Sequence, residues 1–337
     1  MKSEIYLKIR KEYDEKRFNA LAQAEYRLET VKKQVKGFVD IDKEIGKLSL
    51  EACKQILSHP NDTEKIAEQL SKRLAEKTKQ RHTLVEMSGY AKDFLDAKFE
   101  CQECNDTGIM GGVGGDLLCS CFKQKILENM FEESGLVKGK TAQFDKFDLS
   151  IFSDEKDEMR FLIESSPREH IEKIKNRCFN YIQKDFEVLG GKGFLFTGNT
   201  GTGKTFMAQC VANELLLKGR TVAYVSAPIM FDKINEARMT FGEDNYEDYF
   251  AGLKEAELLI IDDLGTETST EAKTSNFLQL LNARTTLDLL CPHKTIISTN
   301  LSLAGIREKY DERIYSRIIG GFYLLKFGGE DLRVVTR

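Results

Sequence analysis

The stretch GFLFTGNTGTGKT, residues 193–205, decides the fold class of this chain. Its first six residues form an apolar run that predicts a buried strand, and the following run TFMAQCVANELLLKG, residues 205–219, predicts a helix. The pattern G-x-x-x-x-G-K-[ST] lies between them, and its glycines let the backbone curl until several N–H groups and a helix start face one anion. The sequence therefore predicts a phosphate-binding loop composed of Gly198, Asn199, Thr200, Gly201, Thr202, Gly203, Lys204 and Thr205.

More strands and helices follow this loop along the chain. Apolar runs at 221–227, 258–263 and 294–300 predict strands, and residues 275–287 predict a helix. Short apolar strands that alternate with helices are typical of a parallel, doubly wound α/β sheet. The loop does not match G-x-G-x-x-G, which argues against a nicotinamide dinucleotide enzyme.

Polar side chains stand at the ends of two of these strands. Asp262 and Asp263 end the run LLIIDD, and Asn300 ends KTIISTN. Ligands of open α/β sheets collect at the carboxyl ends of the strands, so we expect Asp262 to join a Mg²⁺ shell and Asp263 to polarise an attacking water. Lys204 would reach the β- and γ-phosphates, and the Thr205 hydroxyl would hold the same Mg²⁺. The pattern predicts a bound nucleotide phosphate chain and Mg²⁺. The alternative is that the two aspartates cap the next helix or turn and that Asn300 belongs to a strand-to-helix turn.

Four cysteines form two close pairs, Cys101-x₂-Cys104 and Cys119-x-Cys121, within a glycine-rich stretch. Two such pairs separated by a loop can surround one tetrahedral Zn²⁺, so we expect a structural zinc site. The spacing leaves an iron–sulfur cluster and free thiols open as alternatives. The four histidines lie far apart, and we expect them to ligate nothing. Ordinary packing residues are expected at the other cysteines, which are Cys53, Cys178, Cys210 and Cys291.

Composition bounds the class of protein. A length of 337 residues suggests two domains, at roughly 150 residues each. Because 41% of the residues are hydrophobic and the net charge is -4, a wholly disordered chain and a globally basic nucleic-acid coat are excluded. The first residues lack the apolar core of a signal peptide, and no apolar run approaches the ~18 residues of a membrane span. We therefore expect a cytoplasmic protein with reduced thiols and no membrane partner.

Residues 1–97 read as helical, with apolar residues at helical spacing and Pro60 as the single proline. Breaks near 38–40 and 58–61 predict a helical hairpin or small bundle rather than one long coiled coil. The expected domains are a helical N-terminal region at 1–97, a cysteine-rich zinc-binding segment with a linker at 98–137, and an ATPase domain at 138–337.

The phosphate loop, LLIIDDLG and IISTN at these separations resemble the AAA+ ATPases. The run GTGKTFMAQCVANELLLKGRTVAYVSAPIMF and the lead-in Phe144-Asp-Lys-Phe147 are similar to the DnaC/DnaI-type replicative helicase loaders, over about residues 140–337. The resemblance implies an AAA+ P-loop domain with a doubly wound parallel sheet, preceded along the chain by a helical, zinc-binding N-terminal domain. Most AAA+ members carry Asp-Glu where this chain has Asp262-Asp263, which implies slow hydrolysis stimulated by a partner or DNA.

The resemblance also implies roles for side chains beyond the loop. Asn300 takes a sensor role, and Arg317 matches the arginine finger that reaches a neighbouring subunit's nucleotide, with Arg313 as the nearby competitor. Arg333 matches a second sensor that contacts the γ-phosphate. Without the resemblance, Arg313 and Arg317 read as residues of a solvated helix face.

The function implied by the resemblance is ATP-dependent loading of the replicative DNA helicase, with ATP binding and hydrolysis as a switch. Residues 1–135 would bind the helicase, and the chain would assemble on the helicase or on DNA. Single-stranded DNA would be contacted by Phe231, Lys233, Arg238 and Phe241, unless these form an ordinary helix with buried phenylalanines.

Two other functions remain open at this point. One is an IstB-like transposition helper ATPase, which shares the ATPase core but usually lacks a zinc-bearing helical N-terminal domain. The other is a P-loop kinase for a small substrate, which would turn over without partners and would leave Asn300 and Arg317 idle.

Overall fold

The computed structural model describes residues 2–58, 63–112, 115–130, 142–240, 243–268 and 270–335. The chain divides into two compact units, one at Arg10–Thr107 and the other formed by Met1–Ile9 with Gly108–Arg337. Among the described residues, no helix combines the length and the apolar content needed to cross a bilayer.

A five-stranded sheet forms the centre of the larger unit. Its strands are β3 (Gly193–Gly198), β4 (Val222–Ser226), β5 (Leu258–Leu264), β6 (Lys294–Thr299) and β7 (Phe322–Phe327). They lie in the order β4-β5-β6-β3-β7, and every neighbouring pair is parallel. The expected parallel, doubly wound sheet is therefore confirmed. All five carboxyl ends meet at one edge, where the phosphate loop leaves β3.

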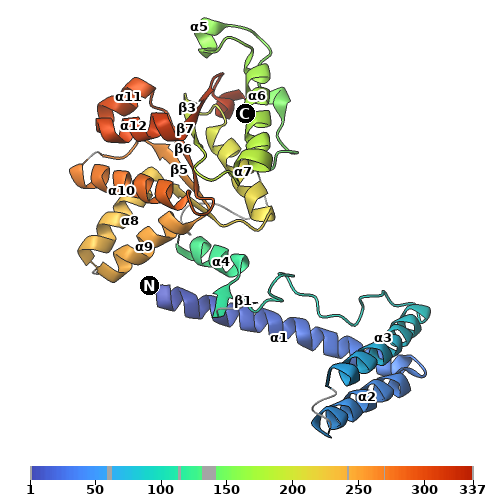
Figure 1. Cartoon of the computed structure of the whole chain (residues 1–337). Helices are drawn as coiled ribbons and strands as arrows, with labels where there is room; N and C mark the ends of the chain where they lie inside the picture. Colours follow the sequence, from blue (N-terminus) through green and yellow to red (C-terminus); the bar gives the residue numbers. More distant parts are fainter. Residues whose placement is uncertain are drawn as a thin grey trace. The chain divides into compact units, whose positions relative to one another are not determined.

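Helices cover both faces of this sheet (Figure 1): α6 and α7 lie on one face, and α8, α9, α10 and α12 on the other. The expected helices at 205–219 and 275–287 are present as α7 and α10. The helices and turns of this unit are α4 (Ser120–Met130), η3 (Leu149–Ile151), α5 (Glu158–Phe161), α6 (Pro167–Asn180), η4 (Tyr181–Asp185), α7 (Lys204–Leu217), α8 (Ala227–Thr240), α9 (Glu243–Glu255), α10 (Glu271–Leu287), α11 (Leu303–Lys309), α12 (Glu312–Gly321) and α13 (Leu332–Val335).

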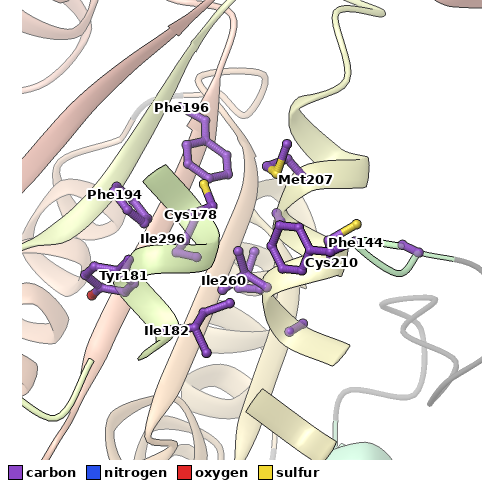
Figure 2. Packing of buried hydrophobic residues seen from close by; sticks show 14 of the residues in the cluster. Phe144, Cys178, Tyr181, Ile182, Phe194, Phe196, Met207, Cys210, Ile260 and Ile296 are labelled. Atoms are coloured by element: carbon purple, nitrogen blue, oxygen red, sulfur yellow. The ribbon is translucent and has the colours of Figure 1, made fainter. Parts of the chain in front are cut away.

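The core between α6, α7 and the sheet holds the phosphate loop in place. Figure 2 shows Phe196 of β3 facing Cys178 of α6, with Met207 of α7 close by. All three side chains are fully buried. Removing apolar surface from water stabilises the folded state by ~25 cal/mol for each Å² buried. The start of α7, which carries the loop lysine, is therefore fixed against β3.

The cysteines outside the two close pairs divide into buried and exposed ones. Cys178 and Cys210 are buried in this core, as expected of packing residues. For Cys291 the prediction is wrong, because its side chain is exposed and its Sγ lies 3.4 Å from Nδ1 of His293. The side chain of Cys53 lies outside the described residues.

The smaller unit is helical, as predicted. Helix α1 (Lys2–Gln34) ends just before Gly37, whose φ of 85° breaks the helix near the expected position. Helices α2 (Phe38–Ser58) and α3 (Thr63–Met87) pack as a hairpin. Two ion pairs, Glu44–Lys77 at 2.6 Å and Asp42–Arg81 at 3.4 Å, show that the two helices are antiparallel. The buried core of this unit contains Val31, Val35, Phe38 and Val85.

Candidate nucleotide-binding site

The phosphate loop turns sharply between β3 and α7. Gly198, Gly201 and Gly203 have φ values of 144°, 75° and 93°, a region that side chains with a Cβ rarely adopt. At Gly198 a Cβ would also lie 2.1 Å from the carbonyl oxygen of Phe327 on the neighbouring strand. Glycine is therefore required both by the backbone angle and by the close approach of β7.

Lys204 begins α7 and folds back over the loop. Its Nζ donates hydrogen bonds to the carbonyl oxygens of Gly198 at 2.8 Å and Asn199 at 2.7 Å, and to Oδ1 of Asn300 at 2.8 Å. Burial lowers the pKa of this ammonium below its usual value, and the charges of Asp263 and Asp262 oppose that effect. The structure thus brings together the lysine of the predicted phosphate loop and the asparagine predicted at the end of a different strand.

The end of β5 is irregular where the two aspartates stand. The register between β5 and β6 shifts between Ile261 and Leu264, and Asp263 has a φ of 54°. Such a bulge re-aims side chains, and here Asp262 is buried while Asp263 is exposed. The N–H of Asp263 donates to Oγ of Ser298 at 3.1 Å instead of continuing the ladder.

Asp262 is held by hydroxyl groups from both neighbouring strands. Its Oδ2 accepts a hydrogen bond from the Tyr224 hydroxyl, and its Oδ1 accepts one from Oγ of Ser298. Neither partner was anticipated from the sequence, where a tyrosine or serine inside an apolar strand reads as packing. A buried carboxylate with oriented hydroxyl partners matches what a Mg²⁺ shell needs.

Asp263 is expected to give hydrolysis an acid limb. Partial desolvation, followed by the charge of Asp262, raises the pKa of Asp263 above its ordinary 3.8, while Lys204 and Arg333 act in the opposite direction. A general base must be ionised, so the hydrolysis rate should fall as the pH drops through this raised pKa. The measurement is kcat for ATP against pH. A rate that stays constant down into the ordinary carboxyl range would contradict the assignment.

The end of the chain crosses the phosphate loop. The N–H of Leu332 donates to the carbonyl oxygen of Gly201 at 3.0 Å, which anchors α13 over the loop. Arg333 follows directly, and its charge acts on the pKa values of both Lys204 and Asp263. The structure therefore brings Arg333 to the same edge as the loop and the aspartates.

An apolar cavity of about 250 Å³ lies beside the loop. Phe147 and Phe152 stack with ring centroids 5.8 Å apart, and Phe206 of α7 meets Phe147 edge-on at 5.6 Å. Gly203 of the loop and Leu332 complete much of its lining. Flat aromatic walls next to a phosphate loop suit a purine base. The sequence pointed to this segment only through Phe147 in the lead-in motif.

The two arginines of α12, Arg313 and Arg317, lie away from the phosphate loop. Arg313 and Arg317 line a cavity of about 860 Å³ together with Gly193, Lys294 and Phe322, the first residues of three strands. They stand at the amino edge of the sheet, opposite the loop of the same chain. Arg313 donates to Oδ2 of Asp311 from Nε at 3.0 Å and from Nη2 at 2.8 Å. The guanidinium of Arg317 forms no hydrogen bond or ion pair with any residue that the structure describes.

The structure buries one of the side chains expected to contact DNA. Phe231 is 1% exposed and packs edge-on against Phe277 at 5.9 Å, so it cannot stack on a base. Lys233 is partly exposed. Phe241 and the side chain of Arg238 lie outside the described residues. The alternative of an ordinary helix with a buried phenylalanine holds at Phe231.

The four clustered cysteines come together. Their Sγ atoms all lie within 4.8 Å of one another, in the set Cys101, Cys104, Cys119 and Cys121. One zinc ion with ~2.3 Å Zn–S bonds would place the sulfurs about 3.8 Å apart. A four-iron cluster would spread them wider, because metals and sulfides lie between the thiolates. The donor set and its spacing therefore fit a single tetrahedral ion.

Local backbone geometry forms this cluster. The carboxylate of Asp106 accepts from the N–H groups of Glu100 at 2.9 Å and Cys101 at 2.8 Å, which closes the first turn. Strands β1 (Ile109–Gly112) and β2 (Gly115–Leu118) pair antiparallel and return the chain to the second pair. The sequence predicted a returning loop but not this hairpin.

Comparison with known proteins finds relatives for the part of the chain that contains the phosphate loop. Residues 170–319 match the family described as IstB-like ATP binding protein. The replicative helicase loader DnaC of Escherichia coli strain K12 is 26% identical over 125 residues, which are 37% of this chain and 49% of that protein. DnaC of Buchnera aphidicola subsp. Schizaphis graminum is 27% identical over 148 residues, 43% of this chain and 57% of that protein. The chain thus spans about half the length of the curated relatives it matches.

Among solved structures, a crystal structure of the DnaC helicase loader matches this chain with 21% sequence identity and a TM-score of 0.41. The match covers 46% of this chain and 89% of the loader's chain. The sequence matches confirm the resemblance to DnaC-type loaders and to IstB-like ATP-binding proteins over this part of the chain.

Proposed function

We propose that this chain is an ATPase that loads the replicative DNA helicase during initiation of DNA replication, with ATP binding and hydrolysis as its switch. The observation that carries the ATPase part is the convergence at one sheet edge: Lys204 bonds both the phosphate loop and Asn300, beside the carboxylates of Asp262 and Asp263. The sequence match to DnaC proteins supports the loading part.

Each side chain at this edge would act on ATP in a defined way. Lys204 would leave its loop carbonyls to bind the β- and γ-phosphates, while Arg333 approaches the γ-phosphate from α13. Asp263 would accept a proton from the attacking water, which Asn300 would orient. The aromatic cavity at Phe147 would seat the base.

Thr205 and Asp262 would hold Mg²⁺. The exposed hydroxyl at the start of α7 and the buried carboxylate on β5 form an oxygen donor set of the kind that this ion prefers. When bound, Mg²⁺ neutralises charge on the phosphates. Asp-Asp in place of Asp-Glu supports slow turnover, which suits a switch better than a motor.

A transposition helper is the second candidate, favoured by the match to the IstB-like family model. The helical unit and the cysteine cluster support the loader instead. The discriminating experiment is capture by the purified full chain, with ATP and Mg²⁺, of either a hexameric replicative helicase or an IS21-type transposase. Retention of the helicase supports loading, whereas retention of the transposase alone would replace it. The same experiment run with single-stranded DNA tests DNA binding and assembly of several chains.

We also propose that the four clustered cysteines hold structural zinc. The purified full chain is expected to contain about one zinc ion, because four thiolates around one point satisfy tetrahedral Zn²⁺. Cys104→Ser should lower that content and loosen residues 101–121 in hydrogen exchange, since such metal binding is folding energy. Cys291→Ser, which changes an exposed cysteine outside the cluster, should keep the zinc. Stoichiometric iron in place of zinc would overturn the assignment.

A further inference from the structure

We propose that Tyr224 is a positioning residue for the metal-site carboxylate Asp262, acting through its hydroxyl group; this rests on the ATPase function proposed above. Tyr224 lies on β4, and Ser226, two residues later on the same face, is the register partner of Asp262 on β5. The hydroxyl of Tyr224 therefore reaches the carboxylate of Asp262 on the adjacent strand β5.

The hydrogen bonds fix both oxygens of Asp262. Oδ2 accepts from Tyr224, and Oδ1 accepts from Ser298 and, at 3.1 Å, from the N–H of Asp263. The Tyr224 hydroxyl is the donor in its bond to Asp262, because a carboxylate oxygen can only accept. A carboxylate has about four acceptor positions, which leaves one here for a water of a Mg²⁺ shell.

The same hydroxyl also lies near the phosphate loop helix. The side chain of Gln209 on α7 is close enough to the Tyr224 hydroxyl to lower its pKa. Gln209 is four residues after Thr205, so the two lie on the same face of that helix. Tyr224 thus stands between the helix that carries one expected Mg²⁺ ligand and the strand that carries the other.

A positioning role and a packing role predict different results for Tyr224→Phe. The ring is 5% exposed, and phenylalanine keeps its packing while removing the donor. If the hydroxyl only stabilised the fold, its loss would lower the melting temperature and leave metal dependence intact. Loss of a hydrogen bond to a metal-binding carboxylate typically costs about 10- to 100-fold in metal affinity.

The chain offers a matched control in Tyr310. It is 6% exposed, and its hydroxyl donates to a carboxylate oxygen of Glu267, a group outside the expected Mg²⁺ site. Tyr310→Phe therefore removes the same kind of bond from the same unit. It should lower the melting temperature about as much as Tyr224→Phe without touching Asp262.

The experiment measures the affinity of the full chain for a fluorescent ATP analogue across a Mg²⁺ titration, with EDTA as the baseline. Tyr224→Phe is expected to raise the Mg²⁺ concentration for half-maximal effect by about 10- to 100-fold and to leave the affinity in EDTA unchanged. Tyr310→Phe should match the wild type in both measurements.

Two outcomes would overturn the inference. A Tyr224→Phe titration that coincides with the wild type would show that the hydroxyl does not position the carboxylate. Equal shifts in both variants would show a general weakening of the unit. If the wild type itself bound no ATP analogue with Mg²⁺, the proposed function would fail, and that result is distinct from either of these.

Discussion

Arg317→Ala is expected to reduce stimulated ATP hydrolysis by about 10³- to 10⁵-fold, because an arginine supplied to a neighbour's nucleotide is worth that much in rate. Its guanidinium has no partner among the described residues and stands at the sheet edge away from its own loop. It is therefore free to act on another subunit's nucleotide. The measurement is steady-state ATPase activity of the chain with helicase and single-stranded DNA present.

Arg313→Ala is the control for that prediction. Arg313 lies one helical turn away but is already engaged by Asp311, so its removal should leave the stimulated rate nearly unchanged. ATP affinity should be unaltered in both variants, since neither arginine reaches the loop of its own chain. An Arg317→Ala protein with the wild-type stimulated rate, or an equal loss in Arg313→Ala, would refute the finger role.

Lys204→Ala is expected to lower kcat for ATP by about 10²- to 10³-fold, the cost of removing one preorganised donor from a developing charge. The buried ammonium already contacts two loop carbonyls and Asn300, so alanine removes the cation and leaves those oxygens without their donor. The measurement is steady-state hydrolysis at saturating Mg²⁺ and ATP.

Lys218→Ala provides the matched comparison for this loss. Lys218 ends the same helix, and its exposed Nζ donates to Oε1 of Gln183. Its removal should leave hydrolysis unchanged, which separates a loss of phosphate contact from a general weakening of α7. Equal activity of the Lys204→Ala protein and the wild type would contradict the phosphate role of this lysine.

The local sequence pattern was enough to predict most strands of the nucleotide-binding sheet. The strand at 193–198 has the bounds of β3, and the strands expected at 258–263 and 294–300 lie within one residue of β5 and β6. Strand β7 was not predicted, because as an edge strand it keeps several exposed apolar side chains and lacks a clear alternation. The strand order itself depends on contacts between distant residues, which periodicity does not encode.

The residues expected to bind the nucleotide and Mg²⁺ could be predicted from the sequence, but the side chains that hold them in position could not. The glycine loop and the aspartate pair carry recognisable spacing, so Lys204 and Asp262 could be named from the sequence. Tyr224 and Ser298 are far from Asp262 along the chain, and an apolar strand gives no sign that a hydroxyl inside it donates to a carboxylate. The bulge at Asp263 likewise becomes visible only in the paired strands.

Nucleotide binding by the purified full chain tests the central claim most directly. Isothermal titration calorimetry with ATP and Mg²⁺ should show one site per chain in the wild type and a much weaker one in Lys204→Ala. Zinc-replete wild-type protein that takes up no ATP or other purine nucleotide with Mg²⁺ present would contradict the account.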